Sequence, residues 1–387
     1  MLTRTTSSQM SDALVKYMAS TQGKFNKLST QLATQKKITS ITDDAVAAKS
    51  ILNAKKEINL YNGYIQNMKN SQHELKAVED TMKTVNTQAS RALDVGMMAS
   101  NGTYSKTEMD AFKQEIDGII QTVTSLANSK YEDAYLFSGT ASLKMPFDLQ
   151  NSAAQTFVDN GDGTYTKSVK DDNGNLTTYK MVNEGTKESP SWKTTVTQPD
   201  GTETTRTTTD DDWKVENSTT INYNGTSDAK TIVIGAGGLE ETVGVLGTSL
   251  FGQGSVTTTS VFNPDTGKST STVDLTGDGG ILASLSQLSA AIGAEDTDAI
   301  TAALGGIQKG IDSLAEAKSA VGLSSNRFDT LMEAYDNNVL NLTSLKSSLE
   351  DADLTSLIAQ WLQSQYALEA SYSLSSQMMS VSIMNYI

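Results

Sequence analysis

The sequence has 387 residues, of which 37% are hydrophobic, a formal net charge of −15 and no cysteine. That length exceeds one ordinary hydrophobic core and predicts two or more units. The acidic balance disfavours a nucleic-acid partner, and the lack of cysteine excludes disulfides and thiolate sites. No apolar run reaches about 18 residues, so we expect no transmembrane helix and no membrane insertion.

The first predicted element is a helix over 14–32. Its apolar positions repeat at 4-3-4-3-4 spacing once Thr21 is included, which is typical of a coiled-coil seam. These seam positions are Leu14, Met18, Phe25, Leu28 and Leu32. The N-terminus has no apolar signal-peptide core and no small-residue cleavage site, so we expect any export to proceed without a cleaved signal peptide.

A second, longer helix is predicted after Asp43 and Asp44, which can cap its N-terminus, and it runs to about residue 98. Its seam is Ile51, Ala54, Ile58, Tyr61, Ile65, Met68, Gln72, Leu75, Glu79, Met82, Asn86, Ala89 and Leu93. The one histidine, His73, lies in this helix. A lone histidine without matching ligands indicates a surface or seam residue and not a zinc site or a triad.

A third helix begins at a capping box formed by Ser105 and Glu108. Its apolar residues are Phe112, Ile116, Ile119, Val123 and Leu126. Beyond it the composition changes, because all four prolines lie between 146 and 264, together with most of the glycines and threonines. Proline and glycine interrupt helices and threonine favours strands, so a compact β domain is predicted at 142–278.

Three hairpins are predicted in this middle region, each with polar alternating runs on both sides of turn residues. Their turns are DDNGN, Pro199-Asp200-Gly201 and Asn263-Pro264-Asp265. The region carries 10 basic and 19 acidic residues, which is typical of a solvated surface.

The predicted β domain contains stretches that resemble ligand-binding, metal-binding or catalytic motifs, but none has the required residues at the required spacing. TIVIGAGGLEETVG resembles a dinucleotide-binding turn, but Glu240 occupies the third glycine position, so a strand and loop are predicted. The DNGDGT turn at 159–164 has Lys170 where an EF-hand needs a glutamate. The aspartates at 210–212 are adjacent and indicate solvated side chains, although two carboxylates acting in hydrolysis need no motif and remain an alternative. The sequence therefore predicts no catalytic, metal-binding or cofactor-binding residue, and no enzyme.

On the C-terminal side, 3-4 spacing predicts a helix through Phe328, Leu331, Tyr335, Asn338, Leu342, Leu345 and Leu349. The acidic break at 350–353 shifts the register. A last helix then carries a predicted apolar stripe, which consists of Leu354, Ile358, Trp361, Leu368, Tyr372 and Met379.

The two chain ends carry opposite charge. Residues 1–42 have six basic residues and one acidic residue, whereas 351–387 have three acidic residues and no basic residue. Two such helices can pair with each other or with neighbouring copies. We therefore interpret the apolar C-terminus as an assembly surface that partners cover.

These patterns predict an α + β fold, in which a long, coiled-coil-like α-helical bundle from both chain termini holds an inserted all-β domain. The predicted domains are terminal axial helices at 1–42 and 351–387, two halves of a helical rod at 43–141 and 279–350, and the β insert at 142–278.

Three stretches resemble the flagellin-like axial proteins of bacterial flagella, and most closely the hook–filament junction branch of that family. They are LSTQLATQKKITSITDDAVAAKSI, ANSKYEDAYLFSGT and the C-terminal SLEDADLTSLIAQWLQSQYALEASYSLSSQMMSVSIMNYI. The resemblance covers about 1–140 and 280–387. The sequence departs from the family at 35–37, where Gln-Lys-Lys replaces a frequent Gly and Arg, and at Ala45, where proline is frequent.

The resemblance implies a structural protein of the extracellular flagellum that serves motility. Such a protein is exported by the flagellar type III apparatus and forms a ring of identical subunits. Its neighbours would be a junction protein on the hook side and flagellin on the filament side, and an export chaperone would hold the C-terminal helix.

Two alternatives remain at this stage. A filament flagellin would share the class but occupy another position. A secreted adhesin or hydrolase would use the β domain for binding or catalysis and the helices as a stalk. The adhesin or hydrolase alternative requires an exposed aromatic platform. The tryptophans in the middle of the chain that could form one are Trp192 and Trp213.

Overall fold

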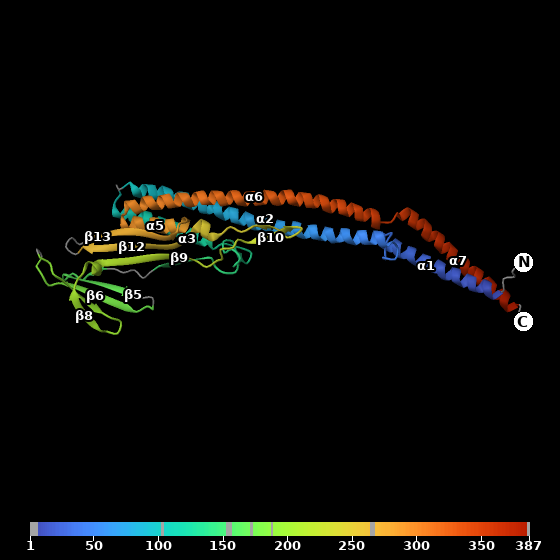
Figure 1. Cartoon of the computed structure of the whole chain (residues 1–387), viewed down its shortest axis with the longest axis horizontal. Coiled ribbons are helices and arrows are strands. Elements are labelled where there is room, and N and C mark those ends of the chain that lie inside the picture. Colours follow the sequence, from blue (N-terminus) through green and yellow to red (C-terminus); the bar gives the residue numbers. More distant parts are fainter. Residues whose placement is uncertain are drawn as a thin grey trace. The chain divides into compact units, whose positions relative to one another are not determined.

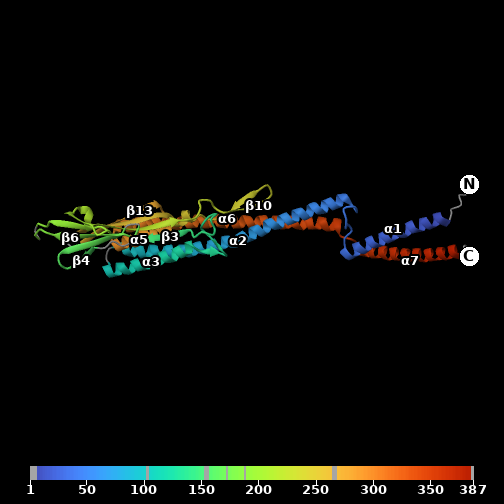
Figure 2. The same ribbon diagram turned by 90° about the horizontal axis from the view of Figure 1, so that it is seen from below.

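The computed structural model describes residues 7–101, 104–151, 157–170, 173–186, 189–263 and 268–384. It consists of long helices and antiparallel strands (Figure 1, Figure 2), which confirms the predicted α + β class. Two compact units make up the chain: Met1–Gln66 with Thr330–Ile387, and Asn67–Asp329. Among the described residues, none of the helices combines the length and hydropathy that a membrane span requires.

Four helices build the first unit: α1 (Ser7–Thr34), α7 (Leu354–Met384), the beginning of α2 (Ala45–Ser100) and the end of α6 (Thr297–Glu350). Figure 1 and Figure 2 show α1 beside α7 in antiparallel orientation. Both helix lines break, between Thr34 and Ala45 on one side and between Glu350 and Leu354 on the other.

The loop between α1 and α2 depends on the predicted aspartate pair. Asp44 caps α2, because its Oδ1 accepts the backbone N–H groups of Val46 and Ala47 at 3.0 and 2.9 Å. Asp43 instead folds the loop, since its Oδ2 accepts the N–H groups of Thr39 and Ser40, both at 3.0 Å. The two aspartates thus divide the capping role that the sequence assigned to both.

A small apolar core closes the first unit beside this loop. Ile38, Ala48 and Ile51 are buried against each other, with Leu349 of α6 packed on them. Farther along α2, the rings of Tyr61 and Tyr64 lie 5.0 and 5.9 Å from the ring of Tyr335 on α6. Apolar and aromatic contacts therefore join α2 to α6 within this unit.

In the second unit the seam of α2 changes register after Met68. The predicted seam residues Leu75, Met82 and Ala89 are buried, but the other four predicted seam residues, Gln72, Glu79, Asn86 and Leu93, are not part of the buried core. Their places are taken by residues one position earlier, which are Ser71, Val78, Val85 and Ala92. His73 is exposed in this stretch. An extra three-residue step at Ser71 shifts the heptad. Gln72 and Glu79 then lie beside the seam, where Gln72 donates to Asp329 Oδ1 at 2.7 Å and Glu79 lies 3.7 Å from Lys318 Nζ.

The helix α3 (Lys106–Ala127) begins at the predicted capping box, in which Glu108 accepts the backbone N–H of Ser105 at 2.7 Å. It packs with α5 (Ile281–Ala294), a helix that is apolar on nearly every side and almost wholly buried. A helix with this pattern must be covered all round. The four-stranded antiparallel sheet β13-β12-β9-β3 supplies part of that cover through Val256 and Val273.

The strands of this sheet are β3 (Phe147–Asn151), β9 (Lys214–Tyr223), β12 (Gln253–Asn263) and β13 (Lys268–Asp278). A second, five-stranded antiparallel sheet has the order β4-β5-β6-β7-β8. Its strands are β4 (Phe157–Asp159), β5 (Thr164–Lys170), β6 (Leu176–Asn183), β7 (Trp192–Thr197) and β8 (Glu203–Thr207).

The three predicted hairpins are confirmed as the pairs β5–β6, β7–β8 and β12–β13. The turn at Pro199-Asp200-Gly201 has Gly201 at φ 84°, a left-handed conformation that glycine adopts without strain. The first two aspartates of DDNGN, and the Pro264-Asp265 part of the third turn, lie outside the described residues.

The predicted strand and loop at TIVIG form a hairpin of β10 (Thr231–Gly235) and β11 (Leu239–Thr242). The insert is not entirely β, because it also contains the short helix α4 (Gly247–Phe251) and one turn of 3₁₀ helix, η1 (Asp210–Trp213). Conversely, the small hairpin β1 (Lys130–Tyr131) and β2 (Ala134–Tyr135) falls in the predicted helical rod.

The YLFSGT part of the 127–140 stretch is a tightly packed turn. Phe137 is fully buried, with its ring 5.1 Å from that of Phe251. Gly139 has φ 65°, and a Cβ there would lie 2.6 Å from Thr226 Oγ1 and 2.7 Å from the Asp228 carbonyl oxygen. A side chain at position 139 would therefore clash with the 226–228 loop, which explains the glycine there.

The two tryptophans of the middle region belong to one aromatic cluster. The rings of Trp192 and Trp213 meet edge to face at 5.1 Å, and Tyr165 and Phe262 pack against Trp213. Trp213 is buried and Trp192 is half-buried. Because the rings cover one another, they join the two sheets and do not form the open platform that the adhesin or hydrolase alternative requires.

Candidate assembly surface

The paired terminal helices are built from complementary 4-3 patterns. On α1 the face toward α7 holds the buried Thr21 and the five predicted seam residues Leu14, Met18, Phe25, Leu28 and Leu32, all half-buried. On α7 the matching face holds Leu357, Trp361, Ser364, Leu368 and Ser371. Two such faces bury apolar side chains against each other and provide the main favourable term for pairing.

Trp361 contacts α1 through both its ring and its indole N–H. Its ring lies 5.5 Å from the ring of Phe25, and its Nε1 donates a hydrogen bond to Ser29 Oγ at 2.9 Å. Toward the chain ends, the Tyr372 hydroxyl donates to Gln22 Oε1 at 3.2 Å. An indole needs both an apolar contact and a partner for its N–H when it packs against a helix, and this site offers both.

The predicted apolar stripe of α7 divides between two faces. Trp361 and Leu368 lie on the face toward α1, whereas Leu354, Ile358 and Tyr372 are 39%, 45% and 52% exposed. The side chain of Met379 lies outside the described residues. Sequence reasoning missed Leu357, Ser364 and Ser371, because it assigned every packed position to a large apolar residue.

Small serines occupy close positions between the helices. Ser371 Oγ donates to the Ala367 carbonyl of its own helix at 2.7 Å, which satisfies the hydroxyl without a partner on α1. The sequence signal for the true face was present, since Leu357, Trp361, Ser364, Leu368 and Ser371 keep an unbroken 4-3-4-3 spacing.

A second face of α7 remains apolar and uncovered in the described part of the chain. Besides Leu354 and Ile358, it includes Leu362 and Tyr366, which follow at four-residue intervals and so lie along one edge of the helix. Leu374 is also exposed. Contiguous exposed apolar surface of this kind marks an interaction site more often than chance exposure. We call Ile358, Leu362 and Tyr366 the outer edge of α7.

The breaks in the two helix lines are fastened to each other. The backbone N–H of Lys37 donates to the Glu350 carbonyl at 2.7 Å, and the N–H of Ala352 donates to the Gln35 carbonyl at 3.1 Å. The Glu350 side chain accepts Lys36 at 2.8 Å and Lys55 at 3.1 Å. Asp353 then starts α7 by accepting the N–H of Thr355 at 3.0 Å.

Two carboxylates at this level have lowered pKa values. Burial acts to raise the pKa of Glu350, but the hydrogen bonds from Lys36 and Lys55 outweigh it and lower the pKa. For Asp43, the ion pair with Lys27 at 2.7 Å, followed by the N–H groups of Thr39 and Ser40, holds the pKa well below its usual range. Both groups are therefore charged at neutral pH.

Comparison with known proteins places one part of the chain directly. Residues 304–387 match the model of the bacterial flagellin C-terminal helical region, which contains most of α6 and all of α7. No curated protein matches the chain by sequence.

One solved structure shows a similar fold over a larger part of the chain. A chain from Vibrio parahaemolyticus, assigned as a flagellar hook-associated protein, aligns with a TM-score of 0.51 and 15% identity, covering 80% of this chain and 100% of its own. FlgL from Bacillus cereus aligns at 0.44 with 17% identity, covering 77% and 99%. Flagellar hook-associated protein 3 from Legionella pneumophila aligns at 0.43 with 15% identity, covering 77% and 98%. Residues 304–387 thus match the bacterial flagellin C-terminal helical region, and this match supports the resemblance to the flagellin-like axial proteins that the sequence indicated.

Proposed function

We propose that this protein is a structural component of the bacterial flagellum that acts at the hook–filament junction. In this role it adapts the subunit arrangement on the hook side to that of the flagellin filament. It performs no catalysis, and its function is mechanical.

One observation carries the proposal. The segment that matches the flagellin C-terminal helical region ends in α7, which covers one face with α1 and leaves the outer edge of α7 exposed. An apolar helix edge in water is stabilised by burial against further copies or neighbouring proteins. The fold likeness to a flagellar hook-associated protein supports the junction as the place of that burial.

The partners follow from this position. Identical subunits form a ring, a junction protein adjoins it on the hook side, and flagellin adjoins it on the filament side. Before assembly, an export chaperone covers α7 in the cytoplasm. The protein reaches the extracellular flagellum through the type III apparatus.

Immunogold microscopy of isolated flagella from the source bacterium tests this assignment. We expect label confined to the boundary between hook and filament. Label along the whole filament would instead identify a filament flagellin, and label absent from flagella would reject both positions. A deletion strain provides the control, since its hooks should carry no label and no filament.

A further inference from the structure

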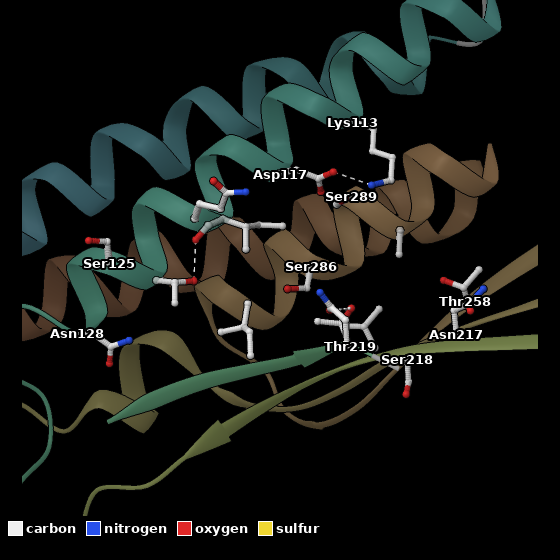
Figure 3. Close-up of a pocket in the computed structure, with 17 residues that line it drawn as sticks. Lys113, Asp117, Ser125, Asn128, Asn217, Ser218, Thr219, Thr258, Ser286 and Ser289 are labelled. Atoms are coloured by element: carbon white, nitrogen blue, oxygen red, sulfur yellow. Dashed lines mark hydrogen bonds and ion pairs between the residues drawn. The ribbon is translucent and has the colours of Figure 1, made fainter. Parts of the chain in front are cut away.

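Two pockets of the molecule differ in how their lysines are paired. One, of about 810 Å³, lies between α3, α5 and the four-stranded sheet of the second unit (Figure 3). Lys113 in its lining lies 2.7 Å from Asp117, so the two charges balance each other. The other, of about 370 Å³, opens in the first unit beside the loop between α1 and α2. We call it the loop pocket, and its lining includes Lys36, Ile38, Ile41, Ile51, Leu52 and Lys55.

The loop pocket is built on the apolar core of the first unit. Ile38, Ala48 and Ile51, which form that core, also line the pocket. Ile41 and Leu52 line it as well, but they are 64% and 56% exposed. Large apolar side chains that stand in water around a pocket mark an interaction surface, because interfaces seat large side chains of the partner in such pockets.

The charges around the loop pocket are mainly positive. Lys36 and Lys55 of the lining share a single carboxylate, so their charges are only partly balanced. Lys49 and Lys56 lie three residues before and four residues after Leu52, on the same edge of α2, and both are exposed. Neither forms an ion pair with any residue that the structure describes. The loop pocket therefore suits a partner that is apolar and carries carboxylates.

The outer edge of α7 has this complementary character. Ile358, Leu362 and Tyr366 form its exposed apolar row. Glu369 follows Tyr366 by three residues, so an exposed carboxylate continues the row. Residues 351–387 as a whole carry three acidic residues and no basic residue. The two surfaces thus match in both apolar character and charge.

We propose that the outer edge of α7 in one copy packs into the loop pocket of a second copy, a contact that rests on the proposed function because it joins neighbours in the ring. Burial of the apolar row stabilises the contact, and the lysines and carboxylates fix its register. Because the two surfaces differ, the contact is head-to-tail, and it continues from copy to copy into a ring or a helical row. Two α7 edges packed on each other would instead close a dimer.

The lack of cysteine allows a direct cross-linking test. Two single-cysteine proteins are made, Leu52→Cys for the loop pocket and Leu362→Cys for the outer edge. They carry different epitope tags and are produced together in the deletion strain. Flagella are then isolated and oxidised, and disulfide-linked dimers are identified by their tags. We expect a dimer that carries both tags, and no dimer when either protein is produced alone.

A matched cysteine variant controls for chance collisions. Gln363→Cys is also exposed on α7, but it lies about 100° round the helix from residue 362. Paired with Leu52→Cys, it should give several-fold less of the mixed dimer than Leu362→Cys gives. Equal yields from the two positions would overturn the proposal.

A second pair of variants tests the charges. Lys49→Glu combined with Lys56→Glu in the Leu52→Cys protein should lower the yield of mixed dimer about threefold, the value of two exposed ion pairs. Lys69→Glu combined with Lys83→Glu makes the same change of charge at exposed positions elsewhere on α2 and should leave the yield unchanged. An equal loss in both variants would contradict charge matching at the loop pocket.

Immunogold labelling of the same flagella separates failure of this contact from failure of the proposed function. Label at the hook–filament junction without a mixed dimer, or with dimers of Leu362→Cys alone, would overturn the contact and leave the proposed function intact. Label absent from the junction would reject the proposed function. The two purified full-length proteins would then be mixed at high concentration and oxidised, and formation or absence of the mixed dimer would decide the contact by itself.

Discussion

Glu350, the last residue of α6, forms an ion pair of 2.8 Å with Lys36 in the loop that follows α1. Glu350 is 3% exposed, and Lys55 of α2 donates to the same carboxylate oxygen at 3.1 Å. One buried carboxylate therefore ties three segments of the first unit together where both helix lines break. Together with the backbone hydrogen bonds between Lys37 and Glu350 and between Ala352 and Gln35, this ion pair holds the terminal pair α1–α7 to α2 and α6.

Glu350→Gln should lower the free energy of unfolding of the first unit by about 2 kcal/mol. The substitution removes the buried carboxylate charge that pairs with Lys36 and Lys55. Both lysines are partly exposed, so solvent screening limits the loss. Urea unfolding followed by circular dichroism measures the change. Glu333→Gln, an exposed carboxylate on the same helix, is the control and should leave the midpoint unchanged. Equal midpoints for the two variants would mean that the joint contributes no stability.

Stability should fall in acid through the same groups. Because the pKa values of Glu350 and Asp43 are lowered on folding, their contribution is complete above the ordinary values of 4.5 and 3.8. It is lost as pH falls below those values toward the folded-state pKa of each group. Unfolding free energy measured from pH 7 down to pH 2 should therefore decline below about pH 4.5.

Asp43→Asn and Glu350→Gln should each flatten part of that decline. If both variants show the same dependence of unfolding free energy on pH as the wild type, other carboxylates cause the loss of stability in acid.

Trp361→Ala should loosen the α1–α7 pair. The substitution removes the ring contact with Phe25 and the hydrogen bond to Ser29, at a cost of about 2 kcal/mol for a half-buried indole. Limited proteolysis should then cut within α1 and α7 faster than in the wild type. Leu362→Ala, on the outer edge of the same helix, should leave the cleavage rate as it was. Equal protection of the two variants would contradict the packing role of Trp361.

The helical plan could be predicted from sequence because its signals are local and periodic. The seam of α1, the capping box at Ser105 and the hairpin around Gly201 each follow from a few neighbouring residues. The buried face of α7 could not be predicted in the same way. It depends on how closely α1 approaches, and that distance allows Ser364 and Ser371 to take positions that a large apolar residue would overfill.

The register change of α2 has a similar origin. A 3-4 pattern can be continued through either Gln72 or Ser71, and the choice is made by the helices that pack on it. The burial of α5 depends on contacts that are farther apart in the sequence, because the sheet that packs on α5 includes strands from distant parts of the chain. For this reason the predicted insert boundary at 142–278 separates α5 from part of its own core.

Two internal deletions should distinguish the structural roles of the two sheets. The five-stranded sheet lies between Asn151 and Asp210 in sequence, so replacing 152–208 with a short Gly/Ser linker should leave α3, α5 and the four-stranded sheet folded. Deleting 146–274 should instead expose α5 and cause aggregation, because β12 and β13 cover it. Thermal unfolding and gel filtration of both proteins measure the difference. Soluble, cooperatively unfolding protein from the larger deletion would contradict the role of the sheet in covering α5.

Incorporation of an outer-edge variant into flagella tests most directly whether the outer edge of α7 is an assembly contact. Ile358→Asp combined with Tyr366→Asp places two charges on the outer edge of α7, and Ser356→Asp combined with Gln363→Asp places two charges on exposed polar positions of the same helix. Each protein is produced in the deletion strain, and labelled hook–filament junctions are counted after the melting temperatures have been compared. We expect unchanged melting for both variants, with junctions formed by the control and none by the outer-edge variant. Normal junctions built from the outer-edge variant would contradict the claim that this edge is an assembly contact.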